Sequence, residues 1–212
     1  MRIACLHTAE SNVAVFARVA AQRGLTLTHQ VRADLLAAAM QAGGVTAELA
    51  ARTGNALLDL TSDADAVLLT CSTLGAAAED IAGKAAVPVL RVDAALARQA
   101  VRNGGKVAVL CAAETTLGPT GALFEKAAQQ TGAVIDLRLV PGAWAAFLAG
   151  ETQQYLAMIA AAADQAFSEG IDVVALAQAS MADAAALCRK GMPLNSPSAG
   201  LDAIAAVLAR SL

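Results

Sequence analysis

A cysteine at the end of an apolar run is the residue of this chain best placed to do chemistry. Cys71 follows Asp65-Ala-Val-Leu-Leu-Thr and precedes Ser-Thr-Leu-Gly, and an alanine-rich helix is expected over residues 76–84. The apolar run is typical of a strand in a parallel sheet, and open α/β sheets bind ligands at the carboxyl ends of such strands. The N-terminus of the next helix favours anions and lowers the pKa of a nearby thiol. We therefore interpret Cys71 as a functional thiol rather than as a small buried hydrophobic residue.

Strand-like runs alternate with helical patterns along the whole chain. Helical spacing of apolar residues is clearest over residues 13–23, 47–60 and 153–169. The strand-like runs cover residues 2–6, 25–31, 66–70, 88–92, 106–111, 134–140, 172–177 and, more briefly, 192–195. This alternation predicts an α/β fold with parallel sheets.

The order of the elements also suggests a duplication. Arg2-Ile-Ala-Cys-Leu-His-Thr is similar to Lys106-Val-Ala-Val-Leu-Cys-Ala, and Asp65-Ala-Val-Leu-Leu-Thr-Cys-Ser is similar to Asp172-Val-Val-Ala-Leu-Ala-Gln-Ala-Ser. We therefore predict two pseudo-symmetric α/β domains, one of residues 1–95 plus 198–212 and the other of residues 96–197. If the halves face each other, loops 7–11, 70–75, 111–118 and 178–181 meet in one active-site cleft.

Composition excludes several classes of function. The chain is 57% hydrophobic but only 3% aromatic, so Ala, Val and Leu must build its core. A net charge of −3 without a long basic cluster argues against a nucleic-acid partner, and charged or Gly/Pro residues interrupt every apolar stretch long enough to span a membrane. The opening residues lack a signal peptide's apolar region, so we expect a cytoplasmic protein with reduced cysteines. With two histidines and no CxxC spacing, we expect no metal site.

The four strand-end segments together resemble the aspartate/glutamate racemase superfamily, which includes glutamate, aspartate and hydantoin racemases, maleate isomerase and arylmalonate decarboxylase. The resemblance covers nearly the whole chain, and Leu68-Leu-Thr-Cys-Ser-Thr-Leu-Gly75 is its best single segment because it looks like the first catalytic-cysteine loop. It implies two pseudo-symmetric domains with the active site between them, and chemistry without cofactor or metal. Racemases of this family place one cysteine on each face of the substrate.

The family's motif positions can be located in this chain, but several of them carry different residues. Cys71 matches the first cysteine and Thr73 a family threonine, whereas Ser72 stands where glutamate racemases usually have Asn. In the segment Leu176-Ala-Gln-Ala-Ser-Met181, Gln178 takes the place of the second cysteine and Ser180 that of a histidine. Further departures lie after the first and fifth strands, where His7-Thr8 replaces an Asp-Ser pair, Ala113 replaces one threonine and Thr116 keeps another.

These departures limit the chemistry. An amide such as Gln178 is neutral and cannot act as a base, so the two-thiol route is closed unless another group replaces the missing cysteine. His7 is the best remaining titratable group, and it either holds a carboxylate, exchanges a proton at neutral pH or merely caps the next helix. A single thiol, Cys71, still suffices for a lyase, a decarboxylase or a cis–trans isomerase. We therefore predict an enzyme of the racemase/isomerase class acting on a small carboxylic or amino acid; the alternative is a catalytically silent carboxylate-binding protein of the same fold.

Small hydroxyl donors at the strand ends complete the predicted site. With Cys71 as the catalytic residue, we expect substrate contacts from His7, Thr8, Ser72, Thr73, Thr115, Thr116, Gln178 and Ser180. Glu10, Asp34 and Glu114 are the charged candidates near the cleft, and the sequence suggests no arginine there. Cys5 and Cys111 lie inside apolar strands and are expected to be inert. We expect no cofactor, and the only partners we consider are a small carboxylate substrate and further copies of the chain.

Overall fold

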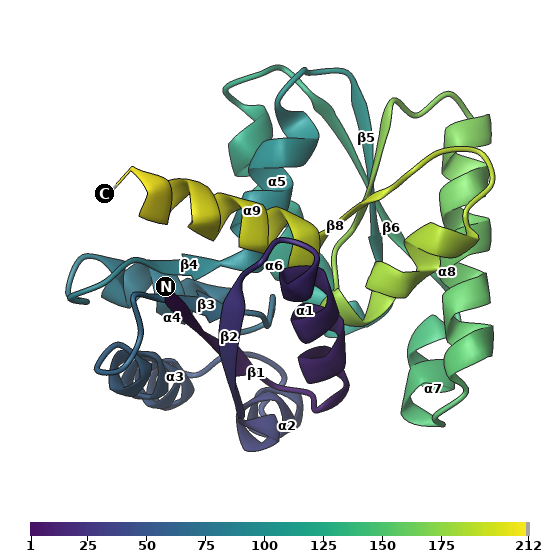
Figure 1. The fold of residues 1–212 in the computed structure, drawn as a ribbon. Helices are drawn as coiled ribbons and strands as arrows, with labels where there is room; N and C mark the ends of the chain where they lie inside the picture. The colour runs from purple at the N-terminus through teal and green to yellow at the C-terminus, as the bar shows by residue number, and fades with distance from the viewer. Residues whose placement is uncertain (211–212) are drawn as a thin grey trace. The chain divides into compact units, whose positions relative to one another are not determined.

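The computed structural model describes residues 1–210, which form two compact units. One unit holds Met1–Ala95 together with the segment from Pro197 onward, and the other holds Leu96–Ser196. Each is built on its own four-stranded sheet with helices packed around it, as the ribbon in Figure 1 shows. The prediction of two pseudo-symmetric α/β halves with parallel sheets is therefore confirmed.

The sheet of the first unit has the strand order β2-β1-β3-β4, and its neighbouring strands are all parallel. Its elements are β1 (Arg2–His7), α1 (Ser11–Ala21), β2 (Thr26–Val31), α2 (Ala33–Gln41), α3 (Ala47–Leu60), β3 (Ala66–Leu69), α4 (Gly75–Ala82) and β4 (Val89–Arg91). The helices α5 (Val92–Val101) and α9 (Ser196–Ala209) each carry the chain from one unit into the other.

The second unit repeats this topology with the strand order β6-β5-β7-β8. Its elements are β5 (Lys106–Cys111), the short 3₁₀ segment Glu114–Thr116, α6 (Leu117–Ala128), β6 (Val134–Leu139), α7 (Ala143–Leu148), α8 (Thr152–Ser168), β7 (Val173–Leu176), a 3₁₀ segment at Ala179–Leu187 and β8 (Leu194–Asn195). The expected eighth strand is therefore present, although it is only two residues long.

Matching hydrogen bonds show how closely the two units correspond. The carboxylate of Asp65 accepts the backbone N–H of Arg2 at 2.7 Å, and the carboxylate of Asp172 accepts that of Lys106 at the same distance. At the other end of the central strands, the N–H of Thr70 donates to the carbonyl of Leu6 at 3.1 Å. The equivalent bond of the second unit joins Ala177 to Leu110 at 3.0 Å. Residues 71 and 178 therefore leave their sheets at equivalent positions.

Each unit buries its own apolar core on one face of its sheet. In the first unit, β1 and β3 contribute every second residue, because successive side chains of a strand point to opposite faces. Residues of α2, α3 and α4 pack against them. The opposite face of β1 carries Ile3, Cys5 and His7, and Phe16 of α1 lies against His7 with 5.2 Å between the ring centroids.

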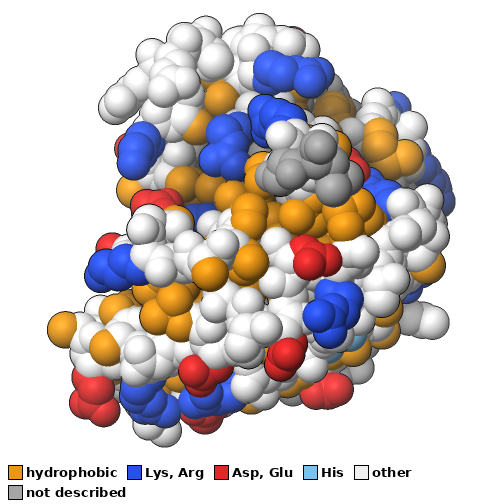
Figure 2. All heavy atoms as spheres, turned by 60° about the vertical axis from the view of Figure 1, so that its left-hand side comes forward, with side chains coloured by type: hydrophobic (Ala, Val, Ile, Leu, Met, Phe, Trp, Pro, Cys, Tyr) orange, Lys and Arg blue, Asp and Glu red, His pale blue; other side chains and the backbone are white. Residues whose placement is uncertain are grey.

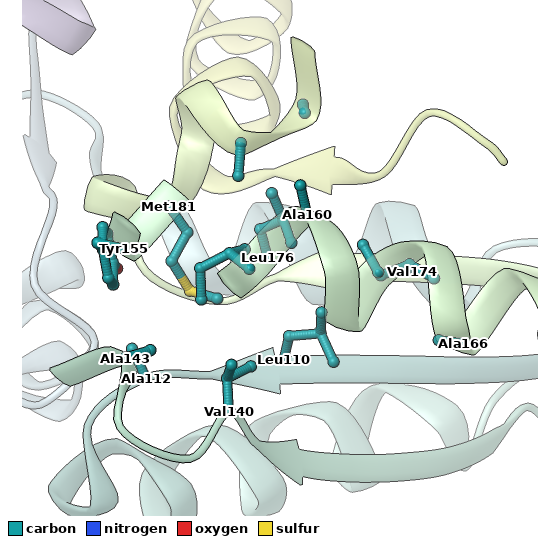
Figure 3. Packing of buried hydrophobic residues seen from close by; sticks show 14 of the residues in the cluster. Leu110, Ala112, Val140, Ala143, Tyr155, Ala160, Ala166, Val174, Leu176 and Met181 are labelled. Atoms are coloured by element: carbon teal, nitrogen blue, oxygen red, sulfur yellow. The ribbon is translucent and has the colours of Figure 1, made fainter. Parts of the chain in front are cut away.

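The second unit has a corresponding core in which α7 and α8 pack on β5 and β7. Figure 3 shows Leu110, Leu176, Met181 and Tyr155 within this cluster. Apart from Tyr155 and Met181, its buried members are aliphatic side chains, mostly alanine. Small side chains let helices approach the sheet closely, so the low aromatic content is compatible with a well-filled interior.

The distribution of charged side chains on the surface agrees with the modest net charge of the chain. On the face shown in Figure 2, Lys and Arg side chains are interspersed with Asp and Glu side chains. Within residues 1–210, none of the helices has the length and apolar character needed to cross a membrane.

Candidate active site

Cys71 lies two residues beyond β3, in the short loop before α4. Its side chain is only 8% exposed, and its neighbours Ser72 and Thr73 are buried as well. Three donors hydrogen-bond its sulfur, namely the hydroxyl of Thr8 and the backbone N–H groups of Thr73 and Leu74. Thr8 comes from the loop after β1, so two adjacent strand ends supply the surroundings of one thiol. Such donors stabilise negative charge on the sulfur.

Burial nevertheless keeps this thiol protonated at neutral pH. Loss of solvent contact raises the pKa of Cys71 above the ordinary value of 9.0, and the negative charge of Asp93 raises it further. The three hydrogen-bond donors lower the pKa, but by less than burial raises it. The expectation that the following helix would give Cys71 a lowered pKa was therefore wrong, because desolvation of the thiolate exceeds the stabilisation from the donors.

An arginine that sequence reasoning missed lies next to this loop. Arg91, at the end of β4, binds Asp93 through a fork of two bonds, 2.7 Å from Nε to Oδ1 and 2.8 Å from Nη2 to Oδ2. Its remaining nitrogen, Nη1, donates to Glu79 of α4 at 2.8 Å. The guanidinium packs against Gly75, the first residue of α4, and would collide with a Cβ added there. Arg91 thus ties β4 to the helix that follows Cys71.

The charged residues that the sequence suggested do not take part in this network. Asp34 pairs instead with Arg32 at 2.8 Å and with Arg52 at 3.0 Å on the surface, and Glu10 and Glu114 are exposed. The Arg91–Asp93 pair was missed because β4 is three residues long, and nothing in its sequence indicates which neighbour the arginine meets.

His7 is not a neutral-pH acid or base in this structure. It is fully buried, its Nδ1 contacts the Thr70 hydroxyl at 2.9 Å, and its Nε2 contacts Nδ1 of His29 at 2.9 Å. Burial, and secondarily the neighbouring His29, lowers the pKa of His7 to about 4. Of the three roles considered for His7, this lowered pKa disfavours proton exchange at neutral pH, and in the structure both ring nitrogens contact side chains.

In the second unit, Gln178 takes the position that Cys71 has in the first. Its Oε1 accepts the backbone N–H of Ala112 at 2.6 Å and that of Ala113 at 3.1 Å. Ala112 and Ala113 follow β5 as Thr8 and its successor follow β1. Because the amide oxygen is held by two donors, the amide is fixed with its NH₂ group directed away from them.

Among the remaining predicted residues, some are hydrogen-bonded within the second unit and others are exposed. The Thr116 hydroxyl is buried and donates to the Ala113 carbonyl at 2.6 Å, whereas Thr115 is exposed. Ser180 shares a 2.8 Å hydrogen bond with Tyr155, whose phenol is buried and whose pKa burial raises to about 12. Tyr155 was not foreseen, since a lone tyrosine in a helix reads as a core residue. Burial also raises the pKa of Cys5 to about 12 and that of Cys188 to about 11.

Comparison with known proteins gives the family. Residues 37–208 match the Asp/Glu/Hydantoin racemase family, and the chain therefore belongs to it. No curated protein sequence matches the chain closely enough to be considered a relative.

Solved structures give the same fold. Allantoin racemase from Pseudomonas fluorescens has a TM-score of 0.64 at 18% identity, over 100% of this chain and 92% of that one. Glutamate racemase isoform RacE1 from Bacillus anthracis has a TM-score of 0.71 at 16% identity, over 99% and 82%. Aspartate racemase from Picrophilus torridus has a TM-score of 0.69 at 12% identity, over 92% and 89%. At these identities the likeness establishes the fold, and with the family match it defines a racemase-type isomerase.

Replacing Gly75 tests whether Arg91 and α4 are packed as described. In Gly75→Ala the new methyl group would displace the guanidinium from Asp93, so we expect a loss of about 2–3 kcal/mol in the free energy of unfolding. Gly83→Ala, at the other end of the same helix, adds a methyl group that meets nothing within 4 Å and is expected to change stability by less than about 0.5 kcal/mol. If urea unfolding showed equal changes in the free energy of unfolding for Gly75→Ala and Gly83→Ala, the packing of Arg91 on Gly75 would be contradicted.

Alkylation of Cys71 tests the raised pKa. Because the pKa lies above 9.0, the rate of iodoacetamide labelling should rise about tenfold per pH unit from pH 7 and still be rising at pH 9. Thr8→Val removes one donor to the sulfur and should slow labelling at fixed pH by roughly tenfold, whereas Thr8→Ser keeps the hydroxyl and should not. Mass spectrometry identifies the labelled cysteine. A labelling rate that levels off below pH 8.5 would show that the pKa is lowered instead.

Proposed function

We propose that this chain is a cofactor-independent enzyme that transfers a proton at the α-carbon of a small carboxylic or amino acid, with Cys71 as its single acid/base group. The observation that carries this proposal is the set of three donors on a buried, protonated thiol. The racemase family of the chain supports the reaction class. The proposal goes beyond the family in assigning the chemistry to one thiol.

The environment of Cys71 suits an acid that becomes a stabilised thiolate. When the Cys71 thiol protonates a carbanion, the S–H bond breaks, a C–H bond forms and the negative charge moves from carbon to sulfur. Thr8 and the N–H groups of Thr73 and Leu74 already point at the atom that receives this charge. Donors held in place before charge develops stabilise the product of the transfer without reorganising. The reverse step, removal of an α-proton by the thiolate, uses the same contacts.

Gln178 supports a reaction on one face of the substrate. An amide whose oxygen is bound to Ala112 and Ala113 has neither the charge nor the lone pair that proton removal requires. Its NH₂ group is a donor suited to a substrate carboxylate or carbonyl. Thr8, Ser72 and Thr73 beside the thiol, and Thr115, Thr116 and Ser180 in the second unit, remain the proposed hydroxyl contacts, although Thr116 and Ser180 already have partners within their own unit.

A nucleophilic role for Cys71, as a cis–trans isomerase would need, is the alternative reaction within the class. A nucleophile and the base of an α-proton exchange must both be thiolates, so the raised pKa of Cys71 disfavours the two roles equally. The family match supports proton transfer over attack on an alkene. The catalytically silent binding protein is the second candidate, and it is favoured by the loss of the second thiol at Gln178.

Isotope exchange distinguishes one-thiol from two-thiol chemistry. A single thiol that removes the α-proton, exchanges it with D₂O and returns deuterium to the same face gives exchange with retained configuration. We therefore expect α-deuterium incorporation without loss of optical rotation, measured by mass spectrometry and polarimetry on aspartate, glutamate and small 2-substituted acids. Allantoin and hydantoin belong in the panel because two structural neighbours are allantoin racemases. Exchange should fall at least about 100-fold in Cys71→Ala.

Installing the missing thiol provides the matched test. The resemblance to the racemases implies a second catalytic cysteine at this position, so Gln178→Cys should convert exchange with retention into racemisation. Racemisation by the unaltered chain that needs Cys71 would reveal a second base and refute the one-thiol proposal. Racemisation that survives Cys71→Ala would refute the role of the thiol. If compounds of the panel bind but none of them exchanges its α-proton, the silent binding protein is favoured.

A further inference from the structure

Three side chains of the first unit, none of which bonds the Cys71 sulfur, could together hold a metal ion. Cys5 and His7 are two residues apart on β1 and so share one face of the sheet, and His29 pairs with Cys5 across the β1–β2 register. The ligand atoms of these three residues lie within 4.8 Å of one another. Cys5 and His7 are fully buried, and His29 on the edge strand β2 is half-buried. Sequence spacing did not indicate this group, because the register of two strands creates it.

The hydrogen bonds around His7 leave one of its nitrogens ready to accept a metal. The Thr70 hydroxyl donates its hydrogen to the Leu6 carbonyl at 3.1 Å, so it can only accept from Nδ1–H of His7 at 2.9 Å. His7 then has its lone pair on Nε2, where it accepts the Nδ1–H of His29 at 2.9 Å. Metal-binding histidines characteristically donate their other ring N–H to an oxygen in this way, which fixes both the tautomer and the ring.

The second unit shows that the fold does not require these polar side chains. The register of β5 and β6 places Val109 opposite Leu137, in the positions that Cys5 and His29 occupy in β1 and β2. Valine and leucine fill these positions with apolar side chains and leave no buried polar atom to satisfy. A buried thiol and a half-buried imidazole in their place cost desolvation that packing alone does not repay. The difference between the two units therefore points to a ligand.

We propose that Cys5, His7 and His29 form a three-coordinate site for a single thiophilic metal ion, with Cu(I) as the ion that fits best. One cysteine with two histidines is a ligand set that favours copper among the first-row metals. The Cys5 thiolate and one Cu⁺ ion make a neutral unit, which suits a buried site better than Zn²⁺, since zinc would leave an uncompensated positive charge and a fourth position to fill.

Binding requires small and local changes. The Cys5 S–H bond breaks and releases its proton to solvent as the Cu–S bond forms, and the Nδ1 proton of His29 moves to Nε2 through solvent so that Nδ1 can bind. Two imidazole nitrogens on one ion at about 2.0 Å lie about 3.3–3.5 Å apart, so the 2.9 Å gap must open by about half an ångström. His29 lies on an edge strand, so its ring is the one free to make this shift. No oxidant or reductant is consumed.

Anaerobic titration of the whole chain with Cu(I) tests the proposal. Cu(I) is supplied as its coloured bicinchoninate complex, and loss of colour measures transfer to the protein. We expect one equivalent to transfer and the thermal midpoint to rise with copper, because an ion that binds the folded state stabilises it. X-ray absorption at the copper edge should show one sulfur and two nitrogen ligands, a readout that needs no variant.

Variants that copy residues of the second unit separate binding from folding. Cys5→Val and His29→Leu introduce the residues found at the equivalent positions there, and each should weaken Cu(I) binding by at least about 100-fold. Cys111→Val and Cys188→Ser alter cysteines of the other unit and should leave the affinity unchanged. No transfer of copper, transfer unaffected by Cys5→Val and His29→Leu, a sulfur-only ligand set, or preferential uptake of Zn(II) at this site would each overturn the proposal.

Discussion

The hydrogen-bonded register between the central strands of each unit is the constraint on which the site depends. In the first unit, the Thr70 N–H bonded to the Leu6 carbonyl brings the ends of β1 and β3 to the same level. The chain therefore leaves the sheet at Thr8 and at Cys71 side by side, which is why a hydroxyl of one loop meets the sulfur of the other. A slip of one residue would turn every side chain of the strand to the opposite face and separate this pair.

Burial and hydrogen bonding act on the Cys71 thiol in opposite directions. Removal from water favours the neutral thiol, whereas Thr8, Thr73 and Leu74 favour the thiolate. Burial has the larger effect in the structure, so the group starts as an acid whose conjugate base already has its partners. A raised pKa is therefore compatible with proton transfer. Arg91 lies at the start of α4, the helix that follows Cys71, but its guanidinium is paired with Asp93 rather than with the sulfur.

The two units share a backbone and differ in the side chains placed on it. Equivalent strand ends carry Cys71 in one unit and Gln178 in the other, and each is held by groups from the loop after the central strand. Equivalent strand interiors carry Cys5 in one unit and Val109 in the other. Each difference changes the chemistry at an equivalent backbone position, so comparison of the two units shows which polar groups the shared fold does not need.

The sequence by itself determined the α/β class, the eight strands, the duplication and the position of Cys71 at a strand end, because apolar periodicity and the repeated Asp65 and Asp172 motifs are local signals. It also indicated that Gln178 cannot be a base, since that follows from the amide group alone. Only the tertiary structure decided the pKa of Cys71, the contact of Arg91 with Gly75 and the meeting of Cys5 with His29. These depend on burial and on strand register, which join residues far apart in the chain and leave no trace in local spacing.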